Sequence, residues 1–435
     1  MRSVFIFAVL LAAAAAVLKE PGELALQLDE DGFEDYLDQW LEQEQSRRPP
    51  SPPSPGGCTF RINGDLGQPQ PVFLRHDPRR RVYKYLEAQG NTGQILASRG
   101  EQIVVACPGQ AIRNIIGTRD VATATCVNNN LVSGAGWLNG NRAFGQLTCS
   151  AHSTPVIHDP NRRCWNGHSV LLVGYNVNNV FYQLYGACFD RNLMRALYVW
   201  YDQTPAHAVH QTRVPRPSTW QPGTFFPGVD LNTLYRQVSQ RNTIGGLITS
   251  TNQRFLAKGH LAAKSDFVFA SAQRATFFYI NAAPQWQCIN AGNWNRLEQN
   301  LRARIGAAGY NTVIYTGTFG VLKLPIQNNR PVDIFLSPTT SKVPVPLYFY
   351  KVAYEESSRR GTAFITINNP YLPLADAERT AHDICPDRCR RNNDFNWLRW
   401  EADRVEVGYS FCCTVDDFRR AIPHLPAFQT NGLLF

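Results

Sequence analysis

The chain has 435 residues and a basic balance, with 43 Lys and Arg residues against 34 Asp and Glu residues and a net charge of +9. Beyond its first residues, no stretch is apolar enough to span a bilayer, which excludes a protein with several membrane helices. The positive charge favours partners that carry phosphate.

The first 18 residues are typical of a secretory signal peptide. Arg2 precedes an apolar run, FIFAVLLAAAAAV, which is too short for a comfortable transmembrane helix. The stretch lacks the repeated arginines of a mitochondrial presequence. We therefore expect a secreted, extracellular protein that is not anchored in a membrane.

Residues 19–48 form an acidic segment with ten Asp and Glu residues, three basic residues and a net charge of −7. It ends at Arg47-Arg48, and a Pro-rich linker covers residues 49–57. We interpret the segment as a propeptide released near Arg48; a disordered solubilising tail is the alternative. Without residues 1–48 the chain keeps 39 basic and 24 acidic residues, a net charge of +15. We hypothesise that the segment covers a basic groove before cleavage.

Residues 58–188 contain short β-prone runs, such as QIVVAC and SVLLVGYNV, separated by clusters of Gly, Asn and Pro. This pattern predicts a β-rich N-terminal domain with antiparallel strands. Behind a signal peptide, its cysteines are expected to form disulfides, although their pairing is not readable from sequence. These cysteines are Cys58, Cys107, Cys126, Cys149, Cys164 and Cys188. The role of this domain, substrate binding or packing, stays open.

Residues 189–435 are expected to form a second, α+β domain with a mixed sheet. Its first strand is ALYVWY at 196–201. Four later β-prone segments, at 313–322, 332–336, 345–356 and 361–371, would extend the same sheet. Helices are expected between and after them.

Four cysteines lie near the end of the chain. Cys385 and Cys389 suit two disulfides with the adjacent Cys412 and Cys413; a zinc site is the alternative. Cys288 is then the candidate free thiol among eleven cysteines.

The central stretch, residues 255–305, contains residue types that suit phosphodiester hydrolysis. His260 is a candidate general base, because neutral imidazole accepts a proton near neutral pH. Asn290 offers a neutral oxygen, a hard ligand that suits Mg²⁺. Lys258 is placed to contact the phosphate. Glu298, eight residues after Asn290, is expected to act through a water, because a regular helix would separate the two by about 12 Å.

The same stretch predicts how these residues are carried. A strand is expected over Ala275 to Asn281, a turn at Pro284 and a helix that begins close to Asn290. Trp294, Leu297, Leu301 and Ile305 recur at helical spacing and are expected in the core.

At these positions the chain resembles the DNA/RNA non-specific endonuclease family, which has a ββα-metal active site. The family motif D-R-G-H reads Ala257-Lys258-Gly259-His260. A second family pattern keeps its spacing here as Asn281, Pro284, Gln285, Asn290, Gly292, Trp294, Leu297 and Glu298. The variants AKGH, INAAPQWQ and GNW look closest to a secreted arthropod branch that degrades double-stranded RNA or duplex DNA.

The resemblance implies a role for each matched residue. His260 would be the general base, Asn290 the only protein ligand of Mg²⁺, with Mn²⁺ able to substitute, and Glu298 an organiser of metal waters. Asn281 would support the site, and Lys258 would take the place of the family's phosphate-binding arginine without its bidentate fork. A further family arginine aligns loosely with Arg216.

Each of these residues could instead have an ordinary structural role. His260 alone could be structural, Asn290 a helix cap, and Glu298 a solvated residue or an ion-pair partner of Arg302. The joint spacing favours a secreted, Mg²⁺-dependent endonuclease acting on DNA or RNA. The family resemblance implies products with 5′ phosphates. Because the imidazole must be neutral, we expect activity that fails below about pH 6.5 unless substrate phosphates move the histidine pKa. The alternative is a weak or inactive secreted nucleic-acid-binding protein. The sequence ranks neither DNA against RNA nor duplex against single strand, and it leaves the oligomeric state open.

Overall fold

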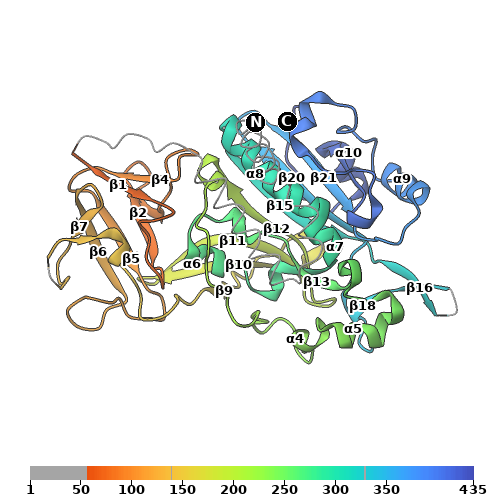
Figure 1. Ribbon diagram of the computed structural model, residues 1–435, viewed down its shortest axis with the longest axis horizontal. Coiled ribbons are helices and arrows are strands. Elements are labelled where there is room, and N and C mark those ends of the chain that lie inside the picture. The colour runs from red at the N-terminus through yellow and green to blue at the C-terminus, as the bar shows by residue number, and fades with distance from the viewer. Residues whose placement is uncertain (1–55, 139, 328–329) are drawn as a thin grey trace, which may run out of the picture.

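The computed structural model describes residues 56–138, 140–327 and 330–435. The expected signal peptide, the acidic segment and nearly all of the Pro-rich linker therefore lie outside the described residues. Figure 1 shows two parts, a smaller β domain at the N-terminus and a larger domain in which helices pack on a long sheet. The predicted α+β class, with a β-rich domain in front, is confirmed.

The N-terminal domain is built on a sheet of six strands in the order β3-β2-β5-β6-β7-β8, beside a separate two-stranded pair, β1 and β4. Disulfides Cys58–Cys126 and Cys107–Cys149 cross-link this domain. Its strands are β1 Cys58–Arg61, β2 Val72–Asp77, β3 Val82–Tyr85, β4 Gln94–Ala97, β5 Gln102–Ala106, β6 Val121–Asn128, β7 Leu131–Ser133 and β8 Arg142–Ala143.

The larger domain is organised around an eight-stranded sheet in the order β22-β21-β20-β15-β12-β11-β10-β9. These strands are β9 Val156–His158, β10 Ser169–Val177, β11 Val180–Asp190, β12 Arg195–Gln203, β15 Thr312–Phe319, β20 Tyr348–Glu355, β21 Arg360–Ile367 and β22 Ser410–Thr414.

Every pairing in this sheet is antiparallel, where a mixed sheet was expected. A tight turn accounts for one of these pairings. Strands β10 and β11 are joined by Asn178 and Asn179, both with positive φ, and a two-residue turn of this kind returns the chain beside the strand it has just left.

The domain boundary falls earlier than the expected position between residues 188 and 189. Strands β9, β10 and β11 hydrogen-bond into the same sheet as β12, so a cut after Cys188 would divide strand β11. The Cys164–Cys188 disulfide also belongs to the larger domain. The sheet is therefore continuous across the expected boundary.

Polar side chains join the two domains. The Asn63 amide donates to the His210 carbonyl oxygen at 3.0 Å and accepts from the Thr212 N–H at 3.0 Å. The buried Gln70 amide donates to Gln211 Oε1 at 2.8 Å. These buried contacts hold the N-terminal domain against residues 210–212, the start of the loop that leads toward the central stretch.

Smaller elements complete the larger domain. Residues 332–336 do not extend the main sheet as expected; they fall in two short hairpins. The hairpin strands are β16 Lys323–Gln327, β17 Arg330–Asp333, β18 Phe335–Ser337 and β19 Lys342–Pro344. Outside the central stretch the helices are α4 Leu231–Leu234, α5 Gln237–Ile244, α9 Leu374–His382 and α10 Val415–Ala421, together with short 3-10 turns. None of the described helices combines the length and apolar character that a bilayer crossing requires.

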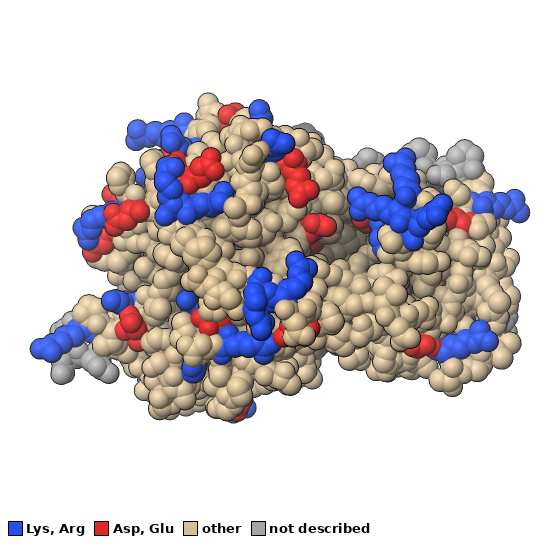
Figure 2. Space-filling view, turned by 180° about the vertical axis from the view of Figure 1, so that it is seen from behind, with Lys and Arg blue, Asp and Glu red and all other residues tan. Residues whose placement is uncertain are grey.

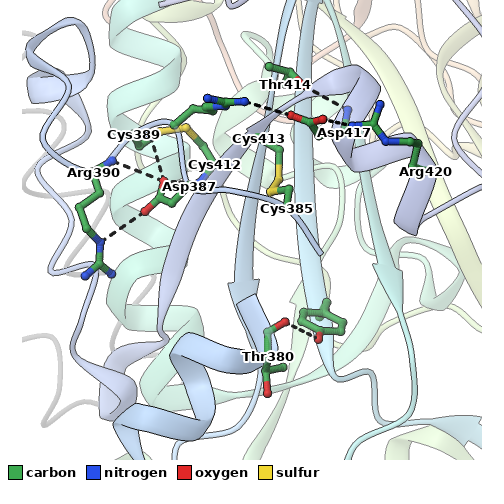
Figure 3. The surroundings of a disulfide bond; sticks show 12 residues. Thr380, Cys385, Asp387, Cys389, Arg390, Cys412, Cys413, Thr414, Asp417 and Arg420 are labelled. Atoms are coloured by element: carbon green, nitrogen blue, oxygen red, sulfur yellow. Dashed lines mark hydrogen bonds and ion pairs between the residues drawn. A yellow bond between two sulfur atoms is a disulfide. The ribbon is translucent and has the colours of Figure 1, made fainter. Parts of the chain in front are cut away.

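The C-terminal cysteines form the two disulfides expected, Cys385–Cys413 and Cys389–Cys412 (Figure 3). The carboxylate of Asp387 accepts the backbone N–H groups of Cys389 at 2.9 Å and Cys412 at 3.1 Å. Because these sulfurs are oxidised, they are not available as zinc ligands. Cys288 is the free cysteine and is buried, and burial raises the pKa of its thiol to about 12.

A buried ionic cluster lies between the main sheet and the long helix α8, Asn295–Ala308. Its centre is Asp266, which accepts the Tyr201 hydroxyl at 2.6 Å and lies 3.2 Å from Arg302 Nε on α8. Lys351 Nζ, on strand β20, lies 3.7 Å from the same carboxylate. Burial opposes ionisation of Asp266, but Arg302 and Lys351 outweigh it and lower its pKa.

Basic residues dominate the described chain, since all 39 Lys and Arg residues and all 24 Asp and Glu residues that follow residue 48 lie in it. In the space-filling view, Lys and Arg side chains lie over both domains and on both sides of a hollow between them (Figure 2). The surface therefore suits an anionic polymer that spans more than one part of the molecule.

Removing one cation from the buried cluster is expected to destabilise the protein strongly. Lys351→Met should lower the free energy of unfolding by about 3–5 kcal/mol, because the Asp266 carboxylate stays buried with less compensation. Denaturant unfolding with the disulfides intact measures the loss. Lys323→Met removes a lysine from an exposed pair with Asp333 and should cost less than about 1 kcal/mol. Equal effects of the two substitutions would contradict this account.

Candidate active site

The central stretch begins with a two-stranded antiparallel hairpin, β13 Leu256–His260 and β14 Ala282–Trp286. Gly259 has a steric reason to be glycine: a Cβ there would lie 2.6 Å from Gln285 Oε1 on the partner strand. The start of β13 is held by Gln240, whose side chain both accepts from the Leu256 N–H and donates to its carbonyl oxygen, each at 2.7 Å. The hairpin therefore fixes the backbone that carries His260.

Two local expectations are wrong here. Residues 275–281 do not form a strand: the N–H groups of Thr276 and Phe277 close turns after helix α6, Ala270–Arg274, and Tyr279–Asn281 is a 3-10 turn. Pro284 is not in a turn but inside β14, opposite Lys258. A proline is tolerated because β14 is an edge strand whose outer side is covered by the Asn368 side chain rather than by another strand.

The helix that follows the hairpin begins at Gln287, three residues before the expected position. Residues Gln287–Ile289 form α7, Asn290–Trp294 form one π-helical turn, and α8 continues from Asn295. The wide turn is anchored by the buried Asn293, whose amide donates to the carbonyl oxygens of Glu401 at 2.9 Å and Gly408 at 2.7 Å. A π turn inside a helix is often found at a functional site.

The core face of α8 is as predicted. Trp294, Leu297, Leu301 and Ile305 are all buried. Because this face is buried, the orientation of the other helix residues relative to the main sheet is fixed.

His260 lies at the end of β13 between two aromatic rings. Its ring centroid is 4.5 Å from that of Trp220 and 5.1 Å from that of Phe277. Its Nε2 atom is buried and has no hydrogen-bond partner among the described residues. Burial, followed by the charges of Lys264, Lys258 and Arg216, lowers the pKa of the imidazole to about 3. The ring is thus neutral, the form a general base requires.

Lys258 and Asn281 flank the histidine in different ways. Lys258 shares the strand face of His260, two residues away, and its ammonium lies 5.4 Å from the Tyr235 ring centroid. Asn281 is fully buried: its amide donates to the carbonyl oxygens of Ala262 and Thr276, both at 2.9 Å, and accepts from the Ala262 N–H at 2.8 Å. Asn281 therefore fixes the backbone that follows the base.

Asn290 is half-buried at the junction of α7 and the π turn. Its amide nitrogen donates to Gln287 Oε1 at 3.1 Å, which orients the side chain. Its carbonyl oxygen accepts no hydrogen bond from the described residues. A single oriented, neutral oxygen fits Mg²⁺, which keeps several waters and takes few protein ligands.

Glu298 is half-buried on α8, one helical turn before Arg302. Burial and then Asp266 raise the pKa of Tyr201 most, and the charge of Glu298 adds to this effect. The π turn interrupts the regular helix assumed for the 12 Å estimate of its separation from Asn290. Arg302 forms an ion pair with Asp266.

Two cations lie near His260, and neither was among the main site residues predicted from sequence. Lys264 is almost fully buried, and Arg216 is half-buried in the loop before Trp220; both lower the pKa of His260. The sequence contains a signal that could have found Lys264. Lys264 and Asp266 lie inside the apolar run HLAAKSDFVF, and charged residues in such a run need buried partners. Arg216 was marked only by its loose alignment with a family arginine.

The hairpin, the π turn and helix α8 form a ββα arrangement, with a histidine at the end of its first strand and an asparagine at the start of the π turn. The profile of the DNA/RNA non-specific endonuclease family matches residues 168–418, more than half of the chain. The chain therefore belongs to the DNA/RNA non-specific endonuclease family, and nucleic acid is its substrate class.

Insect proteins are among the relatives. A salivary endonuclease of Lutzomyia longipalpis is 26% identical over 327 residues, which cover 73% of this chain and 72% of the relative. The salivary protein Tsal2A of Glossina morsitans morsitans is 25% identical over 392 residues, 87% of this chain and 95% of the relative. A chain from a crystal structure of the EndoG/EndoGI complex, on the mechanism of EndoG inhibition, gives only a weak likeness, with a TM-score of 0.32 and 21% identity over 46% of this chain and 81% of that one.

The pKa of His260 changes the expected pH dependence. In the free protein the imidazole stays neutral far below pH 6.5, so if His260 is the base, the acid limb of kcat/KM is expected well below pH 6.5. We expect the acid limb of kcat/KM below pH 5. The acid limb of kcat is expected at a higher pH, because a bound phosphodiester offsets the three cations that disfavour the imidazolium and so raises the pKa of the histidine.

Initial rates on a short oligonucleotide between pH 4 and 8 measure both limbs. Lys264→Gln should move the kcat/KM limb upward, because it removes the cation that contributes most to the lowered pKa after burial. Limbs that coincide near pH 6.5 in both the parent and the variant would show that these cations do not act on the base.

Proposed function

We propose that this protein is a secreted, Mg²⁺-dependent endonuclease that hydrolyses phosphodiester bonds of DNA and RNA, including double-stranded RNA. The observation that carries the proposal is the ββα arrangement itself, in which His260 and Asn290 stand on adjoining rigid elements of a chain that belongs to an endonuclease family. Mn²⁺ is expected to substitute for Mg²⁺.

Each residue has one task in the proposed reaction. His260 takes a proton from the water that attacks phosphorus. The bond from phosphorus to the 3′ oxygen breaks, that oxygen takes a proton from solvent, and the products are a 5′ phosphate and a 3′ hydroxyl. Lys258 and Arg216 hold the phosphodiester, and Lys264 adds to the positive potential around it.

The divalent ion would be held by Asn290 through its carbonyl oxygen, with Glu298 acting through water. When bound, Mg²⁺ supplies positive charge that stabilises the transition state and the leaving oxygen. Gln287 keeps the Asn290 amide nitrogen turned away, so that the oxygen is the atom offered.

Secretion is supported by two observations. The described chain has five disulfides, which form and persist in oxidising compartments. Two relatives carry salivary names. The proposed signal peptide and the proposed propeptide lie outside the described residues.

One observation favours the second candidate, a nucleic-acid-binding protein with weak or no catalysis. An imidazole with a pKa of about 3 has little driving force to accept a proton, and catalysis by a base falls as its pKa falls below the working pH. The proposed enzyme therefore depends on the bound phosphate to raise this pKa.

Single substitutions separate the two candidates. His260→Ala should reduce the hydrolysis rate about 10²- to 10⁴-fold, and Asn290→Ala or a chelator should reduce it to background, while nucleic-acid binding persists. Plasmid DNA and duplex RNA, resolved on gels with and without chelator, provide the readout. His382→Ala and Asn396→Ala, at exposed positions, are matched controls that should cleave like the parent. Retarded but intact nucleic acid in every lane, the parent included, would support the binder.

Substrate choice needs its own measurement. Initial rates are measured on four substrates of one sequence: single-stranded DNA, duplex DNA, single-stranded RNA and duplex RNA. We expect measurable cleavage of duplex RNA. Absence of any rate on duplex RNA beside cleavage of duplex DNA would remove that substrate from the proposal.

A further inference from the structure

One face of the N-terminal sheet is open and hollowed. A hollow of about 620 Å³ lies over strands β2, β3, β5 and β6, and a second of about 450 Å³ adjoins it, since Tyr83, Val104 and Thr123 line both. We call the two together the open groove. None of the residues assigned to catalysis lines it. The groove is therefore a second concave surface outside the active site.

The open groove presents aromatic rings to solvent. Tyr83 is 45% exposed on strand β3 and lies directly opposite His76 of β2 in the strand register. Their ring centroids are 5.2 Å apart, with the ring planes inclined at 63°. An exposed tyrosine on the face of an antiparallel sheet offers a flat surface on which an unpaired base can stack.

Positive charge borders the same rings. The turn between β2 and β3 contains three consecutive exposed arginines, Arg79, Arg80 and Arg81, and it follows Pro78, which lines the first hollow. No carboxylate of the described residues lies within ion-pair distance of these three guanidinium groups. Within the groove, Glu101 is already offset by Arg75, at 2.8 Å. Arg119 adds a further exposed cation to the second hollow.

The open groove continues onto the larger domain. Val177, Asn178 and Tyr182, at the turn between strands β10 and β11, form part of the second hollow. The junction is fixed, because the Tyr85 hydroxyl donates to the Tyr182 carbonyl oxygen at 2.7 Å. A ligand lying in the groove would therefore touch both domains at once.

We propose that the open groove is a second nucleic-acid-binding site, which holds a single-stranded segment of the substrate. Tyr83, with His76 beside it, stacks on an unpaired base, and the arginine turn binds the backbone phosphates on either side. The site assists the proposed endonuclease by retaining long substrates, and this role rests on the proposed function; the binding itself does not.

Protection of an exposed sheet edge does not account for this surface. Lys84 on β3 is the kind of charged residue that guards an edge, and it pairs with Glu87 at 3.4 Å. The three arginines stand in the turn and not on the strand, and β3 also exposes Val82 and Tyr83. An apolar peptide would not use the arginines. The combination of exposed aromatic rings with a cationic rim fits single-stranded nucleic acid.

Binding is tested in the full chain with His260→Ala and a chelator present, so that hydrolysis does not interfere. Fluorescence anisotropy with a labelled 20-nucleotide single strand measures affinity from about 50 to 200 mM salt. The triple variant Arg79→Gln, Arg80→Gln, Arg81→Gln should bind at least about 10-fold more weakly, and the slope of log affinity against log salt should fall by about 2, since each phosphate contact with a single strand contributes about 0.7.

Two further comparisons identify the contacts. Tyr83→Ala should weaken binding by about 5-fold or more with little change in salt slope, and Tyr83→Phe should bind like the parent, because the ring is kept. A matched triple variant, Arg99→Gln, Arg391→Gln and Arg399→Gln, removes the same charge from exposed positions outside the groove and should change affinity less than about 3-fold. Unchanged thermal melting of each variant establishes that it is folded.

Any of three results overturns the proposal. The two triple variants could lose affinity equally, or Tyr83→Ala could bind like the parent. The third result is that duplex binds more tightly than single strand, while Tyr83→Ala weakens duplex binding no more than it weakens single-strand binding. In the active protein, the arginine-turn variant should raise KM for long single strands while leaving the rate on a dinucleotide-length substrate unchanged. Failure of the proposed enzyme would appear as no cleavage by the parent, an outcome separate from these binding results.

Discussion

One buried carboxylate, that of Asp266, connects the parts of the molecule that carry the chemistry. It lies six residues after His260 and forms an ion pair with Arg302 on α8, the helix that continues from the turn containing Asn290. Through Tyr201 and Lys351 it also contacts the main sheet. A carboxylate in such surroundings is tolerated only if its cations stay close, so the distance between the segment after the base and the long helix is tightly constrained.

The same cationic surroundings bear on the base. Lys264, in the 3-10 turn that ends at Asp266, is one of three positive groups that disfavour proton uptake by His260. In the proposed reaction these groups attract a phosphodiester, and the anion then weakens their effect on the imidazole. The proposal therefore couples substrate binding electrostatically to activation of the base.

The candidate site residues stand out in the sequence because each belongs to a short segment with strong local constraints, and their roles stay predictions. Gly259, for example, has no room for a Cβ, and Trp294 and Leu297 fill the core beneath the helix. The pairing of cysteines at the C-terminus followed from their adjacency. Predictions failed where tertiary contacts override local preference: the apolar residues 275–281 are buried without joining a strand, and Pro284 lies in a strand because a side chain covers its outer edge. The π turn and the true domain boundary depend on contacts with residues 401–408 and on strand pairing across the boundary, which local patterns do not contain.

The single unpaired cysteine has a chemical consequence for a cystine-rich chain. Thiol–disulfide exchange requires a thiolate that reaches a sulfur atom, and Cys288 satisfies neither condition: it is enclosed between the hairpin and the π turn, and with a pKa of about 12 it stays protonated. The five cystines therefore have no internal nucleophile to reshuffle them once the chain has folded. An odd thiol is harmless in this protein because the packing of its neighbours keeps it inert.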